Sequence, residues 1–192
     1  MDIPKTVQPW KVIDSTIAFE TNWIRVRQDT CELPDGSIID DYFVVEKPDV
    51  ASIVAITPDQ HVVFNYQYKH GIKEVVFEIP GGMVDEGEEP KAAATRELEE
   101  ETGYVAKEVH YVTTMIGSPT SDTNRFHIFV GLDAECTGTK KIDPREVIES
   151  ELLDYNDIDA EIENGRINVV WSVGALKVAQ QWIDKNKKSR NE

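Results

Sequence analysis

The chain has 192 residues, 40% of them hydrophobic and 29% charged, a composition typical of a globular protein of one domain. Its formal net charge of −16 creates a field that repels nucleic acid and anionic membranes, so we expect neither as a partner. The same field repels an anionic phosphate substrate unless metal cations and local basic groups reverse its sign within the site.

The cysteines and the N-terminal sequence indicate a reducing compartment. Cys31 and Cys136 are far apart and lack CxxC spacing, which predicts free thiols and argues against a disulfide framework or a zinc site. Residues 1–10 lack the layout of a signal peptide, and no apolar run approaches the length that spans a membrane. We therefore expect a cytoplasmic protein.

The N-terminal part of the chain is rich in β-branched and aromatic residues. This content predicts strands over residues 11–19, 23–33 and 37–46. The Pro-Asp-Gly sequence at 34–36 predicts a hairpin turn between the last two. The Lys-Pro-Asp sequence at 47–49 interrupts the pattern and predicts a boundary. We expect an N-terminal β-strand segment over 1–47 and a second domain over 48–192.

Beyond this boundary the pattern alternates between strands and helices. Strands are expected over residues 51–56, 62–68, 75–79, 110–116, 126–132 and 147–153. A helix is expected after Pro90, which suits a first turn, and before Gly103, which suits a helix end. Further helices are expected near 157–164 and over about 172–185. This order predicts an α/β fold with helices packed on a mixed sheet.

Four glutamates crowd into the C-terminal end of the first expected helix. At about 100° per residue, Glu97, Glu100 and Glu101 share one arc of the helix, whereas Glu99 points toward solvent. Carboxylates three and four residues apart repel one another. A hard cation such as Mg²⁺, or Mn²⁺, would remove that repulsion by binding the carboxylate oxygens. The alternative is a solvated acidic face.

Residues 82–104 read GMVDEGEEPKAAATRELEEETGY. They fit the pattern Gly, five residues, Glu, seven residues, Arg-Glu-apolar-x-Glu-Glu-x-Gly-apolar at every specified position. The specified positions are Gly82, Glu88, Arg96, Glu97, Leu98, Glu100, Glu101, Gly103 and Tyr104. This sequence resembles the Nudix box, the signature of hydrolases that split nucleoside diphosphates linked to another moiety. The resemblance implies a Nudix-type α/β/α sandwich and metal-dependent substitution at phosphorus by water.

The resemblance also implies a set of metal ligands. Glu97 and Glu101 would be the principal ligands, Glu100 would share a further ion, and Gly81 would contribute its backbone carbonyl. The metal neutralises phosphate oxygens, positions the water and lowers its pKa. The cofactor expected from the resemblance is Mg²⁺, with Mn²⁺ as an alternative.

Catalytic roles are implied for Arg96, Glu88, Glu100 and Asp122. Arg96 would orient Glu88 and the neighbouring carboxylates through charge-assisted hydrogen bonds. In one branch of this family, the loop after a proline usually has a Gly and then a Glu that serves as general base or extra ligand. Residues 119–125 contain no Glu, so Asp122 is the nearest candidate. Weaker candidates for the base are Glu149 and Glu151.

Features outside the box resemble the ADP-ribose pyrophosphatase branch of the Nudix family. They are the strand-rich N-terminal segment, the sequence Phe-Glu-Ile-Pro-Gly-Gly at 77–82, and Pro119 after the box. In that branch the N-terminal strands build a homodimer, with the substrate between subunits. The substrate-binding residues implied here are Arg25, Arg27, Tyr68, Lys69, Glu78, Pro119 and Arg125, with Trp23 and Tyr66 as further stacking candidates. Ordinary packing or a solvated side chain is the alternative for each.

The first substrate expected from this resemblance is ADP-ribose, which hydrolysis would convert to AMP and ribose 5-phosphate. Two departures from the branch keep other substrates open. Lys69 stands where the branch has an Arg, and a lysine cannot form a bidentate fork on phosphate. The loop at 119–125 lacks the Glu. GDP-mannose, a dinucleotide or a coenzyme are alternatives, as is a non-catalytic module that senses a nucleotide.

Overall fold

The computed structural model describes residues 7–138, 140–141 and 147–189, which divide into two units. The first unit combines Met1–Pro48 with Ile116–Asn124. The second combines Asp49–Met115 with Arg125–Glu192. The domain boundary after residue 47 stays a prediction. In the structure, the later segment Ile116–Asn124 groups with the N-terminal strands.

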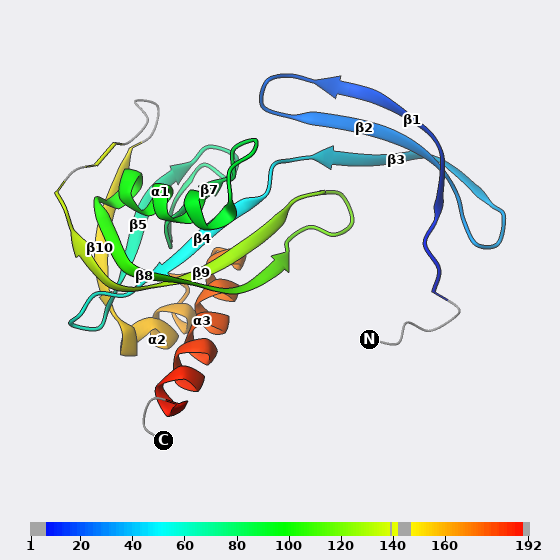
Figure 1. The fold of residues 1–192 in the computed structure, drawn as a ribbon. Helices are drawn as coiled ribbons and strands as arrows, with labels where there is room; N and C mark the ends of the chain where they lie inside the picture. Colours follow the sequence, from blue (N-terminus) through cyan, green and yellow to red (C-terminus); the bar gives the residue numbers. More distant parts are fainter. Residues whose placement is uncertain (1–6, 139, 142–146, 190–192) are drawn as a thin grey trace. The chain divides into compact units, whose positions relative to one another are not determined.

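Three antiparallel strands form the sheet of the first unit (Figure 1). β1 (Lys11–Glu20) pairs with β2 (Arg25–Glu32), which pairs with β3 (Ile38–Glu46). Gly36 adopts φ 85° in the turn between β2 and β3, a conformation that suits glycine. All residues of β1 are exposed, including the apolar Val12, Ile13, Ile17 and Phe19. The predicted N-terminal antiparallel strands are confirmed.

A four-stranded sheet with mixed strand directions lies in the second unit. β4 (Val50–Ala55) pairs in parallel with β9 (Arg125–Cys136) and antiparallel with β7 (Gly81–Met83). β8 (Tyr104–Ile116) flanks β9 and completes the order β7-β4-β9-β8. The prediction of a mixed sheet is therefore confirmed.

A second sheet of this unit is antiparallel. β5 (His61–Lys69) lies in its centre, between β10 (Ile148–Asp154) and β6 (Glu74–Glu78). The β5–β6 register places Asn65 opposite Glu78. This pairing matters for function because both side chains are buried near the end of the helix that carries the glutamates.

Helices cover both faces of the four-stranded sheet (Figure 1). α1 (Pro90–Thr102) buries Ala93, Ala94 and Leu98 in one core, together with Ala51, Ile53 and Ala55 of β4. α3 (Val170–Ser189) buries Ala175, Leu176 and Ala179 in the other, together with Val54, Ile56, Ile128 and Val130. Because alternate strand residues point to opposite faces, β4 contributes to both cores. The structure confirms the predicted α/β/α sandwich.

Several element boundaries differ from those predicted, most of all the start of β8. β8 begins at Tyr104, well before the predicted start at residue 110, because Gly103 ends α1 and sends the chain directly into the strand. Lys107 and Glu108 are exposed on β8, and these two consecutive charged residues interrupt the alternation of apolar and polar residues that predicts a strand. The last helix is longer than predicted, and a 3-10 turn, η1 (Tyr155–Asp157), leads into α2 (Ile158–Glu163). Among the described residues, no helix combines the length and apolarity needed to cross a membrane.

Candidate active site

Three carboxylates lie at the C-terminal end of α1, where negative charge is least favourable for a helix. α1 ends at Gly103, which adopts φ 74° and donates its N–H to Glu99 O at 2.8 Å. Glu99, Glu100 and Glu101 lie in the last turn, which holds no basic residue. The negative end of the helix dipole disfavours anions there. Glu99, predicted to point to solvent, is half-buried. This arrangement costs helix stability, as functional residues often do.

Arg96 is bonded to three carboxylates at once. Its Nε and Nη2 donate to the two oxygens of Glu88 at 3.0 and 2.9 Å. Its Nη1 donates to Glu97 Oε1 at 2.7 Å and to Glu100 Oε2 at 3.2 Å, and its Nη2 also donates to Met83 O at 3.1 Å. The hydrogen bond from Arg96 lowers the pKa of Glu88. Arg96 therefore fixes the loop before α1 against the helix.

Glu101 is the most buried of the box carboxylates, at 8% exposure. Its Oε2 accepts hydrogen bonds from Asn65 Nδ2 at 2.9 Å and from the Gly81 N–H at 3.2 Å. Burial raises the pKa of Glu101 to about 8, and the charge of Glu97 adds to the rise. Metal-free Glu101 is therefore protonated at neutral pH.

The hydrogen bonds to Glu101 continue away from the helix. Asn65 Oδ1 accepts from Ser150 Oγ at 3.0 Å, and Ser150 Oγ accepts from Lys140 Nζ at 3.0 Å. Asn65 lies on β5 and Ser150 on β10, so these hydrogen bonds connect Glu101 to the antiparallel sheet. Sequence reasoning missed Asn65, because its contact with Glu101 joins residues 36 apart.

Lys69 and Glu78 lie beside the same carboxylate. Lys69 Nζ bonds Glu78 Oε1 at 2.6 Å and also donates to Gln67. Burial raises the pKa of Glu78, which is 4% exposed. The charge of Lys69 lowers the pKa of Glu101, and that of Glu78 raises it. The structure thus brings together Lys69, Glu78, Glu97, Glu101 and Gly81.

The carboxylate and carbonyl oxygens at the end of α1 suit a hard divalent cation, although they are not arranged as a preformed metal site. Across the described ranges, no three His, Cys, Asp or Glu side chains form a group that could hold a metal ion. Glu97 and Glu100 are bonded to Arg96 instead. Glu97 and Glu101 nevertheless offer only oxygen donors and flank Gly81 and Gly82, and the charge of Glu97 raises the pKa of Glu101. Mg²⁺ typically takes one or two protein carboxylates.

Gly81 and Gly82 are required for different reasons. A Cβ on Gly82 would lie 2.3 Å from Glu97 Oε1. A Cβ on Gly81 would lie 2.7 Å from Ala51 O and 2.9 Å from the Cα of Ser52, both on β4. An added methyl at Gly82 therefore displaces a flexible carboxylate, whereas one at Gly81 forces two paired strands apart.

We predict that Gly82→Ala lowers hydrolytic turnover by about 100-fold while leaving the fold stable, because a misplacement near 1 Å of a catalytic group costs that much. Turnover and the urea midpoint of unfolding are measured on the same sample. Gly81→Ala is the matched control, in which the midpoint falls as well. A Gly82→Ala variant with normal turnover would show that the position of the Glu97 carboxylate does not matter.

Three of the predicted residues belong to the first unit and are ion-paired there. Arg25 lies 3.4 Å from Glu20 and 3.2 Å from Glu46. Arg27 bonds Glu46 at 2.6 Å and Asp29 at 3.1 Å. Asp122 Oδ2 accepts from Lys47 Nζ at 2.6 Å. This bond lowers the pKa of Asp122, which makes it a weaker base. Its role, like those of the arginines, stays a prediction.

The remaining predicted substrate-binding residues are Pro119, Tyr68 and Arg125. Pro119 lies exposed in the loop of the first unit. Tyr68 is 51% exposed on β5, and its hydroxyl lies 3.4 Å from His70 Nδ1. Arg125 opens β9 and donates its backbone N–H to Asp49 Oδ1 at 2.8 Å. Their roles also stay predictions.

Sequence reasoning missed Arg166, which joins three strands of the second unit. Its guanidinium lies 4.2 Å from the ring centroid of Phe77 and donates to the Tyr66 hydroxyl and to Glu151 Oε1, each at 2.5 Å. Glu151, a weak candidate for the base, is therefore paired. Glu149 is exposed on β10.

Comparisons with protein families match both parts of the chain. Residues 46–170 match a model described as NUDIX domain. Residues 10–45 match a model described as nucleoside diphosphate sugar hydrolase N-terminal domain. The two matches follow one another in the order of the predicted segments.

Curated relatives and a solved structure are similar over much of the chain. A methanol dehydrogenase activator of Bacillus methanolicus is 31% identical over 62% of this chain, which spans 64% of that protein. An ADP-ribose pyrophosphatase of Bacillus subtilis (strain 168) is 29% identical over 79% of each chain. The crystal structure of an ADP compounds hydrolase matches with a TM-score of 0.84 at 21% identity, over 95% of this chain and 98% of that one. At that identity the structural match concerns the fold.

Proposed function

From the premise that this chain belongs to the Nudix hydrolase family, we propose that it hydrolyses the pyrophosphate bond of a nucleoside diphosphate sugar. ADP-ribose is the first substrate, with AMP and ribose 5-phosphate as products. The observation that carries the proposal is the pair of buried or half-buried carboxylates, Glu97 and Glu101, held against two glycines at the end of α1.

The substrate class is supported by the match of the N-terminal segment. Residues 10–45 match the N-terminal domain of nucleoside diphosphate sugar hydrolases. The Bacillus subtilis relative, whose name is ADP-ribose pyrophosphatase, is similar over 79% of this chain. A chain that cleaved free nucleotides alone would have no evident use for this segment.

The residues of the second unit divide the catalytic work. Glu97 and Glu101 would hold Mg²⁺ or Mn²⁺, with Glu100 and the carbonyl of Gly81 as further donors. Once bound, such a metal neutralises phosphate oxygens and lowers the pKa of water. Arg96 holds Glu88 and the helix carboxylates in place. Lys69, paired with Glu78, supplies a positive charge near Glu101 for the diphosphate.

We also propose that the chain forms a homodimer through its N-terminal strands. The apolar Val12, Ile13, Ile17 and Phe19 of β1 are each 44–56% exposed in the single chain. Exposed apolar patches mark interaction surfaces, and these four apolar side chains all lie on one exposed strand. Light scattering after size-exclusion chromatography is expected to give twice the chain mass of 21.7 kDa, and a monomer would contradict the proposal.

The substrate is tested by a panel of diphosphates supplied with Mg²⁺. ADP-ribose, GDP-mannose, a dinucleotide and a coenzyme are each incubated with the protein, and the monophosphate products are identified by chromatography. ADP-ribose is expected to have the highest kcat/KM. A preference for another member would change the substrate but keep the reaction class. Failure to cleave any diphosphate would contradict the proposal and favour the nucleotide-sensing module.

A further inference from the structure

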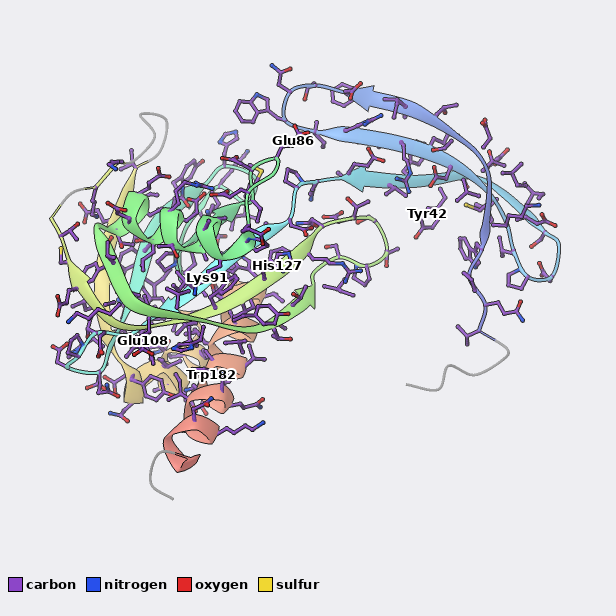
Figure 2. All side chains as sticks on the ribbon, in the orientation of Figure 1. Tyr42, Glu86, Lys91, Glu108, His127 and Trp182 are labelled. Atoms are coloured by element: carbon purple, nitrogen blue, oxygen red, sulfur yellow. The ribbon has the colours of Figure 1, made fainter. Side chains whose placement is uncertain are left out.

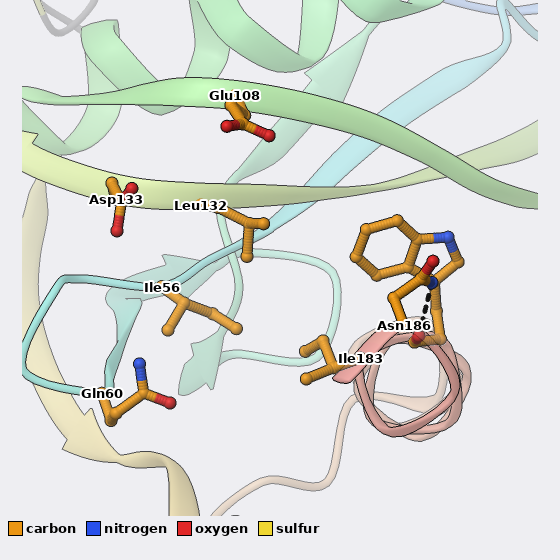
Figure 3. A pocket seen from close by; sticks show the side chains of 8 residues that line it. Ile56, Gln60, Glu108, Leu132, Asp133, Ile183 and Asn186 are labelled. Carbon is orange, nitrogen blue, oxygen red and sulfur yellow. Dashed lines mark hydrogen bonds between the residues drawn. The ribbon is translucent and has the colours of Figure 1, made fainter. Parts of the chain in front are cut away.

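A cavity of about 190 Å³ opens on the face of the second unit that α3 covers (Figure 3). β8, β9, α3 and the segment between β4 and β5 contribute to its walls. The lining residues are Ile56, Gln60, Glu108, Leu132, Asp133, Trp182, Ile183 and Asn186. α1 and its glutamates pack in the other core, on the opposite face of the sheet. The cavity is therefore separate from the candidate active site.

Four of the eight side chains that line the cavity are apolar, and the other four are polar or charged. Figure 3 shows the side chains of Ile56, Leu132 and Ile183 pointing toward one another across it. Trp182, on α3, adds an aromatic wall (Figure 2), and its ring lies 5.0 Å from that of His110. Asn186 Nδ2 donates to Trp182 O at 2.7 Å, which fixes the amide at the edge.

The charged groups that line the cavity are both acidic. Glu108 and Asp133 are exposed and contribute carboxylates, and no basic residue lines the cavity among the described residues. His110 Nε2 lies 3.0 Å from Glu108 Oε2. The nearby Lys107 is bonded to Glu135 at 2.5 Å. A ligand that enters the cavity therefore meets negative charge at its polar end.

Two lining residues have a backbone conformation that favours glycine. Gln60 has φ 63° and Asp133 has φ 51°. Among the described residues, Lys73 is the only other non-glycine residue with positive φ. A positive φ carries a steric cost in a residue other than glycine, and such residues are often found at functional sites. Both Gln60 and Asp133 line the cavity.

The surrounding hydrogen bonds impose these conformations. Gln60 closes a turn by donating its N–H to Thr57 O at 3.0 Å. At Asp133 the strand β9 forms a bulge. The Ile56 N–H donates to Gly131 O and Ile56 O accepts from the Ala134 N–H, each at 2.8 Å, so two residues of β9 lie between the two bonds. Glycine would fit either place without strain, yet both positions carry polar side chains that line the cavity.

We propose that this cavity binds a small organic ammonium ion whose aromatic or alkyl portion fills the interior. A cavity of about 150 Å³ accommodates benzene, so this one has room for a ring and a short chain. The ring would lie against Trp182, Ile56 and Leu132. The ammonium group would lie between Glu108 and Asp133, with the Gln60 amide as a further acceptor.

The test uses 2-phenylethylammonium as the probe and isothermal titration calorimetry as the measurement. The probe is expected to bind at least tenfold more tightly than neutral 2-phenylethanol. Asp133→Asn, which tolerates positive φ and removes the charge, is expected to weaken binding at least tenfold. Equal binding of both probes, or unchanged binding by Asp133→Asn, would overturn the proposal, as would no binding of the ammonium probe.

A second set of variants separates binding from folding. Gln60→Gly is expected to raise the thermal midpoint of unfolding and to weaken binding of the probe, because strain and ligand contact are removed together. Lys73→Gly is the matched control, which raises the midpoint and leaves binding unchanged. Gln60→Gly with full binding would remove Gln60 from the site. These variants lie outside the α1 region, so loss of hydrolysis would not follow from them.

Discussion

Replacing Glu101 by glutamine is expected to lower turnover of a nucleoside diphosphate sugar at least about 100-fold, since altering even the outer contacts of a metal costs 10- to 100-fold. Glutamine keeps the size and an acceptor for Asn65 and Gly81, whose bonds to Glu101 measure 2.9 and 3.2 Å. The fold is therefore preserved while the ability of the side chain to ionise is lost. Steady-state kinetics at several Mg²⁺ concentrations give kcat and the apparent metal affinity.

Glu99→Gln is the matched control for this experiment. Glu99 lies in the same helical turn, and its backbone carbonyl, which the substitution keeps, accepts from Gly103. We expect its turnover to stay within a few-fold of the parent. Glu97→Gln should resemble Glu101→Gln and raise the Mg²⁺ requirement. Near-normal turnover of Glu101→Gln would show that the metal ligands lie elsewhere.

In metal-free protein, the free energy of unfolding is expected to fall by up to about 5 kcal/mol as pH rises from about 4.5 to about 8. Folded Glu101 has a pKa of about 8, whereas its ordinary value is 4.5. Below pH 4.5 the carboxyl is protonated in both states, and the contribution is fully present. Above that pH the unfolded state ionises first, and the contribution is lost through pH 8.

Urea unfolding in a chelating buffer, repeated across this pH range, measures the effect. Other groups titrate too, so the informative quantity is the difference between the parent and Glu101→Gln, which cannot ionise. The parent should lose stability with pH relative to the variant, and added Mg²⁺ should restore it near pH 8. Parallel curves for parent and variant would show that burial does not perturb Glu101.

Local sequence patterns sufficed for much of the fold. Pro90 and Gly103 bounded α1, and the helical period placed Glu97 and Glu101 on one side of it, because these signals act within a few residues. The start of β8 was missed because Lys107 and Glu108 break its apolar alternation on an exposed strand.

Contacts between distant segments could not be predicted in this way. Lys69 was expected at the substrate phosphate, and its ion pair with Glu78 depends on the β5–β6 register. Asn65 and Arg166 have no motif of their own, since their partners are set by how the sheets pack. The resemblance implied that Arg96 pairs with Glu88, and the geometry of that pair depends on how the loop before α1 folds.

The hydrogen bonds behind Glu101 all run in one direction. Lys140 donates to Ser150, Ser150 to Asn65, and Asn65 to Glu101, so each dipole has its positive end toward the carboxylate. Aligned dipoles polarise one another. The ionisation of a nearly inaccessible acid is thereby coupled to an amine at the protein surface. We therefore expect the ammonium resonance of Lys140 to shift when Glu101 ionises.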